Sequence, residues 1–121
     1  MKKYRLTSLP DNREGHFLKG IIPGNHINGG GMGFKKPGQR THSFDGPEGR
    51  DWHVHDDEYE VFVILGGKAV LEVKGEKHPM VTGDVFVVEP GEDHHLVADA
   101  EDPCVNLFLH AGNSRSEVQE G

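Results

Sequence analysis

The sequence has a single cysteine, few aromatic residues and no long apolar run, and each shortage excludes a class of protein. Cys104 is the only cysteine, so no disulfide can form within this chain, and we expect a reducing compartment. The longest nearly apolar run, residues 61–67, is far too short to cross a bilayer. The lysines at the start are not followed by an apolar stretch, so we expect no secretory signal.

The charge balance is acidic. Lys and Arg together number 13 against 20 Asp and Glu, which gives a net charge of -7 with neutral histidines. An acidic surface repels nucleic-acid phosphates and anionic lipids. We therefore expect a cytoplasmic protein with no nucleic-acid and no membrane partner.

Turn-forming residues are abundant, with 17 Gly and 7 Pro, and no segment shows a helical apolar period. From residue 52 onward, short apolar segments alternate with turn signals, which is typical of an all-β sandwich or barrel. Gly66-Gly67 predicts a hairpin turn, and Pro79 predicts an edge strand. The expected strands cover residues 52–55, 60–65, 68–74, 77–81, 85–89, 94–98 and 104–110.

A length of 121 residues suits one domain. We expect residues 1–45 to form an N-terminal arm with early strands, including one around Met32 to Phe34. We expect residues 46–112 to form the core and residues 113–121 a polar tail. Some core candidates could instead bury in a dimer interface, because their strands are apolar on both faces. The core candidates are Phe62, Ile64, Val70, Val85, Val87, Leu96, Val105, Leu107 and Leu109.

Nine histidines suggest metal binding, and the stretch DWHVHDDEYE places two of them close to a cluster of carboxylates. His53 and His55 share one face of a strand, and a hairpin at residues 56–59 would bring Glu60 beside them. A fourth ligand has to come from His94 or His95, which point to opposite faces. Three imidazoles and one carboxylate suit one divalent ion such as zinc, iron, nickel or manganese.

The alternative without function is that this stretch is an exposed charged loop. For Asp56, Asp57 and Glu58 we expect a solvated turn rather than an acidic pocket entrance that attracts cations. Asn106 and His110 share a face of the last strand, which either lines a pocket or leaves His110 in solvent. Cys104 is expected to be a small core residue rather than a nucleophile.

The spacing of these residues resembles the cupin motifs. His53, His55, Glu60 and Gly67 match the first motif, HxH(x)4E(x)6G, and Gly91 and His94 match the second. Three positions depart from the family pattern: Glu89 stands in the proline place, Pro47 in a glycine place, and Ala98 in the place of an asparagine. The resemblance covers residues 46–110.

The resemblance implies a double-stranded β-helix, the jelly-roll barrel of cupins. It also implies a metal site of His53, His55, Glu60 and His94, with His95 in reserve, and a homodimer paired through its sheets. The leading hypothesis is a small metal-dependent enzyme, such as a dioxygenase, isomerase or decarboxylase, acting on a carboxylate or sugar derivative. His110 or His42 would be its acid or base. The alternative hypothesis is a non-catalytic module that binds or senses a small ligand.

Overall fold

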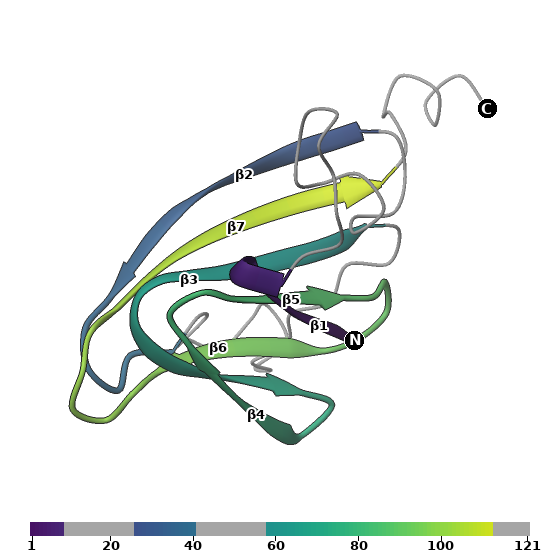
Figure 1. Cartoon of the computed structure of the whole chain (residues 1–121). Coiled ribbons are helices and arrows are strands. Elements are labelled where there is room, and N and C mark those ends of the chain that lie inside the picture. The colour runs from purple at the N-terminus through teal and green to yellow at the C-terminus, as the bar shows by residue number, and fades with distance from the viewer. Residues whose placement is uncertain (9–25, 41–57, 113–121) are drawn as a thin grey trace.

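The computed structural model describes residues 1–8, 26–40 and 58–112. Apart from one short 3-10 turn, all regular elements in these ranges are strands, which confirms the all-β prediction (Figure 1). No helix in the described ranges has the length and apolarity needed to cross a membrane. The elements are β1 (Lys2–Arg5), η1 (Leu6–Ser8), β2 (His26–Lys35), β3 (Tyr59–Val73), β4 (Glu76–Val81), β5 (Asp84–Val88), β6 (His94–Ala98) and β7 (Cys104–Gly112).

The long strand β3 belongs to two sheets. Its first half pairs with β5 and β7 in a sheet of order β1-β5-β3-β7-β2, which we call sheet A. Its second half pairs with β4 and β6, which form sheet B with it. All of these pairings are antiparallel, and the two sheets enclose an interior between them (Figure 1).

The hairpin predicted at Gly66-Gly67 is wrong, because β3 runs through this point. Instead, β7 keeps pairing along β3, with Gly66 opposite Val105 and Gly67 opposite Cys104. The register shifts between Ile64 and Gly66, so the strand contains a bulge. Gly67 has a φ of 73°, and a Cβ there would collide with the carbonyl oxygen of Pro103. The chain therefore bends from sheet A into sheet B instead of folding back.

The bulge changes which residues of β3 face inward. Before it, Phe62 and Ile64 lie in the interior core; after it, Leu71 and Val73 do. Val70, which the sequence placed in the core, is only half-buried because it falls on the opposite face. Other strands complete the interior core with Met80, Phe86, Val88, Leu96, Ala98 and Cys104.

A second apolar cluster lies on the outer face of sheet A. Val61, Val63, Val85 and Val87 are all at most 2% exposed. Burial of Val85 and Val87 confirms the prediction, but on the face opposite to the interior. The half-buried side chains packed against this cluster are Tyr4, Tyr59, Leu107 and Leu109.

Among the described strands, β1 and β2 are the edges of sheet A, and β4 is an edge of sheet B. Strand β4 pairs only with β3, with Pro79 opposite Val70, which confirms the predicted edge. Strand β2 is longer than the expected segment around Met32 to Phe34 and pairs along its whole length with β7. Strand β1 was not predicted from the sequence.

Candidate metal centre

Glu60 and His94 meet in the interior. Glu60 lies on the inward face of β3 in sheet A, and His94 begins β6 in sheet B. They are 4% and 1% exposed, and Nε2 of His94 lies 2.9 Å from Oε1 of Glu60. The ring of Phe62 contacts the His94 ring edge-on, at 5.8 Å between centroids. Two of the four predicted ligands are thus adjacent and shielded from water.

The other ring nitrogen of His94 fixes its tautomer. Nδ1 lies 2.8 Å from the backbone carbonyl oxygen of Glu92, which can only accept a hydrogen bond, so Nδ1 donates. A neutral ring then presents a lone pair at Nε2 toward the Glu60 carboxylate. Two lone pairs repel, so this contact requires a shared proton or a cation. Donation from the second nitrogen to a carbonyl is also what usually orients a metal-binding histidine.

The separation of these two atoms fits a metal ion. Adjacent ligand atoms of a six-coordinate ion with bonds of about 2.1 Å lie about 3.0 Å apart. The contact between Nε2 of His94 and Oε1 of Glu60 measures 2.9 Å. This spacing is that of two neighbouring ligands of one ion, and it is also that of a direct hydrogen bond between the two side chains.

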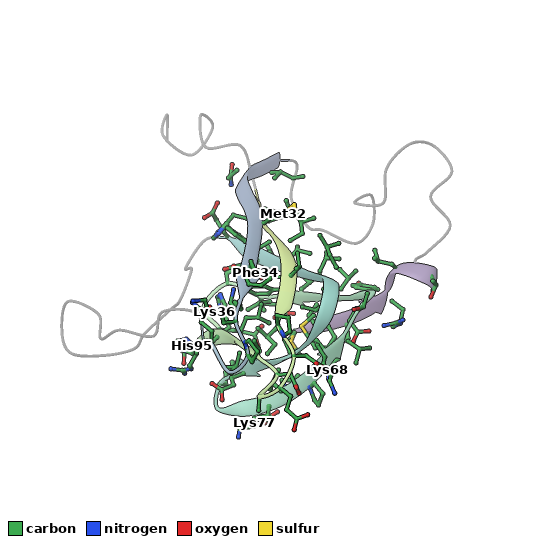
Figure 2. The ribbon with its side chains drawn as sticks, turned by 90° about the vertical axis from the view of Figure 1, so that its left-hand side faces the viewer. Met32, Phe34, Lys36, Lys68, Lys77 and His95 are labelled. Atoms are coloured by element: carbon green, nitrogen blue, oxygen red, sulfur yellow. The ribbon has the colours of Figure 1, made fainter. Side chains whose placement is uncertain are left out.

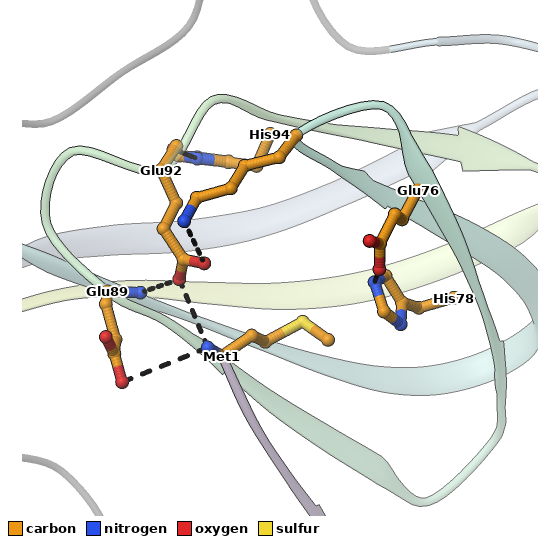
Figure 3. Close-up of polar contacts among 7 residues, drawn as sticks. Met1, Glu76, His78, Glu89, Glu92 and His94 are labelled. Atoms are coloured by element: carbon orange, nitrogen blue, oxygen red, sulfur yellow. Dashed lines mark hydrogen bonds and ion pairs between the residues drawn. The ribbon is translucent and has the colours of Figure 1, made fainter.

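A tight turn before β6 holds the Glu92 carbonyl in place (Figure 3). The Glu89 N–H donates to the Glu92 carboxylate at 2.7 Å, and the Met1 amine and Lys74 ammonium lie 3.3 Å and 3.7 Å from it. Burial alone would raise the pKa of Glu92, but these three partners hold it below its ordinary value. The carboxylate therefore stays charged and stiffens the turn that positions His94.

His110 lies next to Glu60 on the same face of sheet A. The two residues are opposite each other in the pairing of β7 with β3. Nδ1 of His110 lies 3.8 Å from Oε1 of Glu58, whose Oε2 accepts a hydrogen bond from Asn28 at 2.8 Å. The solvated turn expected at Glu58 is wrong for this residue, which is 7% exposed and contacts Asn28 on β2 and His110 on β7. Asn28 and Glu58 were not predicted as site residues.

His95 points away from the interior. It follows His94 on β6, so its side chain lies on the opposite face, and it pairs in register with Glu72. Its Nε2 lies 3.4 Å from Oδ1 of Asp93. The reserve ligand therefore faces away from Glu60, and His94 faces toward it.

Three predicted site residues, His53, His55 and His42, lie outside the described residues. Within the described ranges, no group of three or more His, Cys, Asp or Glu side chains could hold a metal ion. Glu60 and His94 would supply half of the predicted four-ligand set, and the HxH histidines remain predicted as the other half.

Comparisons with known proteins agree with this fold. A cupin protein of Bacteroides fragilis superposes with a TM-score of 0.58 at 22% identity, covering 67% of this chain and 62% of that one. A predicted oxalate decarboxylase of Thermotoga maritima superposes with a TM-score of 0.53 at 25% identity, covering 65% and 61%. A sugar phosphate isomerase of Silicibacter pomeroyi gives 0.54 at 24%, covering 66% and 47%.

The sequence also matches a curated protein over a short stretch. It is 36% identical over 44 residues to the oxalate-binding protein of Thermotoga maritima, which is 36% of each chain. The chain spans less than two thirds of this protein and of the three structural relatives. Residues 40–110, more than half of the chain, match the family described as Cupin domain. The chain therefore belongs to the cupin family, and its fold is the double-stranded β-helix of that family.

Proposed function

We propose that the protein is a small metal-dependent cupin enzyme that acts on a small polar molecule. Its divalent ion would be held by His53, His55, Glu60 and His94. The observation that carries the proposal is the buried contact of Glu60 with His94, whose Nδ1 donates to a carbonyl while Nε2 faces the carboxylate at 2.9 Å. A buried polar pair of this kind is expensive to keep for stability alone.

A bound divalent ion would supply Lewis acidity to polarise a carbonyl or carboxylate oxygen, or would activate dioxygen if it were iron. The chain itself supplies a candidate proton carrier in His110, beside Glu60 on the neighbouring strand. The Glu58 carboxylate lies 3.8 Å from Nδ1 of His110, close enough to form an ion pair with the protonated ring. His110 could therefore give or take a proton next to a substrate on the metal.

The names of the relatives suggest the substrate class. One is called an oxalate-binding protein, one a predicted oxalate decarboxylase and one a sugar phosphate isomerase. All three names describe small, oxygen-rich anions that can chelate a metal. We infer that this chain acts on a compound of that class, in the cytoplasm, as a homodimer.

The second candidate is a non-catalytic module that binds a small ligand, which the name of the oxalate-binding relative favours. Turnover separates the two. Metal-loaded protein would be incubated with oxalate, and formate and carbon dioxide would be measured beside a His110→Gln variant. Turnover that falls in the variant, with oxalate affinity retained, supports decarboxylation of oxalate. Binding without any product supports the module for this ligand.

The metal site is tested by titrating zinc, manganese, nickel and iron(II) into the wild type and two neighbouring variants. His94→Ala removes the inward ligand, and His95→Ala removes the histidine that faces away. We expect His94→Ala and the double variant His53→Ala/His55→Ala to weaken metal binding by more than about 100-fold. His95→Ala should bind metal as the wild type does. A wild type that takes up none of these metals overturns the proposal.

A further inference from the structure

A lysine lies on the inward face of β2, far from the residues that the motifs identify. Met32 and Phe34 on this strand are 68% and 65% exposed, and both point away from the interior (Figure 2). The alternate residues Gly31, Gly33 and Lys35 therefore face inward. Lys35 is half-buried and pairs with Cys104, near the bend of β3.

The Lys35 side chain turns back along the interior toward the metal centre. Its Nζ lies 3.3 Å from Oδ1 of Asn106, which is 1% exposed and pairs with Gly33 one step along the strand. A Cβ on Gly33 would lie 2.8 Å from this oxygen and 3.4 Å from Nζ. Glycine at position 33 therefore gives the lysine and the amide room to meet.

Within the described part of the chain, the charge of Lys35 has no carboxylate partner. Its hydrogen-bond partner is a neutral amide, and it forms no ion pair with a carboxylate of the described residues. Burial lowers the pKa of Lys35, and the electrostatic influence of Cys104 and of Glu60 opposes that effect. The Glu60 carboxylate at the metal centre thus acts electrostatically on the Lys35 ammonium, although the two side chains are not in contact. A divalent ion bound to Glu60 would cancel much of that negative charge.

The inward face of β2 carries no side chain of its own between the lysine and the metal centre. Opposite His110, Phe108 and Asn106, β2 carries Gly29, Gly31 and Gly33. These positions add no side chain to the interior. A Cβ at Gly31 would press on the Phe108 ring at 3.3 Å.

From these contacts we propose that Lys35 anchors the anionic group of a small ligand whose other end binds at the metal centre. This group would be an oxyanion, either a carboxylate or a phosphate, held by the Lys35 ammonium that Asn106 positions. A lysine provides a point charge that either oxyanion can use. The metal end of this arrangement rests on the proposed function, and the Lys35 end does not.

The test is calorimetric titration of oxalate, succinate and inorganic phosphate into metal-loaded and metal-free protein. Lys35→Met removes the inward charge with little change in shape, and Lys36→Met makes the same change one residue later at an exposed site. We expect Lys35→Met to weaken the best-bound anion by about tenfold or more. Lys36→Met should leave the affinity for this anion within about twofold of the wild type, and Lys35→Arg should retain most of that affinity. The anion bound most tightly distinguishes a carboxylate ligand from a phosphate ligand.

A second variant guards against misfolding of the first. Asn106→Asp keeps the shape but pairs Lys35 with a carboxylate, so anion affinity should fall although the lysine remains. Metal affinity should be unchanged in Lys35→Met. Equal anion affinity in Lys35→Met and the wild type, or no anion binding in either, overturns the inference. If the wild type takes up no metal, the proposed function fails, and the metal-free titrations still decide the role of Lys35.

Discussion

The two faces of sheet A bury very different side chains on the same strands. Glu60 faces inward at 4% exposure, and its neighbour Val61 faces outward at 0%. Among the described residues, the outer face buries an apolar cluster of valines around Val61. The inner face buries Glu60 and Asn106 as well as apolar residues, and it faces the buried His94 of sheet B. Apolar burial explains stability, and buried polar groups reduce it unless they are fully paired. This difference between the two faces is what the proposed function predicts, because a ligand or metal site needs buried polar groups.

Replacing the inner polar pair with apolar side chains, so that the inner face resembles the outer one, should change stability and metal binding the most. The double variant Glu60→Leu/His94→Leu replaces a buried polar pair with apolar side chains. Such replacements are often neutral or stabilise a protein by about 1–4 kcal/mol, so the metal-free protein should gain stability up to that amount. Metal binding should be lost. Urea unfolding monitored by circular dichroism measures the first effect, and metal titration the second.

The matched change on the outer face is Val61→Ala. It should lower the free energy of unfolding by about 1–3 kcal/mol and leave metal affinity unchanged. Should the apolar double variant prove less stable than Val61→Ala, the inner pair would be a structural element, and the contrast between the faces would lose its functional meaning.

The contrast also depends on the bend of β3, because the bulge there decides which face each later residue occupies. Gly67→Ala forces a Cβ into the Pro103 carbonyl at a φ of 73°. We expect a loss of about 1–3 kcal/mol in unfolding free energy, measured by urea denaturation. In Gly66→Ala the new Cβ would meet Val105 at an ordinary 3.8 Å, so this control should lose less. Equal losses would mean that the bend does not require glycine at position 67.

Much of the fold followed from local sequence signals. Short apolar segments between turn residues predicted the strands from Glu60 to His110 closely, because each strand is bounded by glycine, proline or acidic residues. The bend at Gly66-Gly67 was missed because a paired glycine looks the same in a hairpin and in a bulge. That choice depends on β7, which comes almost 40 residues later. The error on Val70 follows directly from it.

The site was predictable only where residue types and spacing carry the chemistry. Motif spacing selected Glu60 and His94, and alternation along β6 correctly left His95 on the other face. The burial of Glu58 and the inward position of Lys35 were missed, since the charged residue itself looks the same whether buried or solvated. The alternate glycines at 29, 31 and 33 were the available signal for Lys35, because they mark an inward face emptied of side chains.

The smallest expected change in stability lies at the edge of the outer face. Unlike the buried valines of β3 and β5, Met32 and Phe34 on β2 are 68% and 65% exposed (Figure 2). The double variant Met32→Ser/Phe34→Ser should alter the monomer's unfolding free energy by less than about 0.5 kcal/mol. If the proposed homodimer pairs through this face, light scattering coupled to size-exclusion chromatography should show a wild-type dimer and a monomeric variant. A variant that remains dimeric would move the interface elsewhere, and a monomeric wild type would remove the homodimer from the proposal. In either case the exposed pair would be ordinary surface, and the outer face would divide at β7 into a buried half and an exposed half.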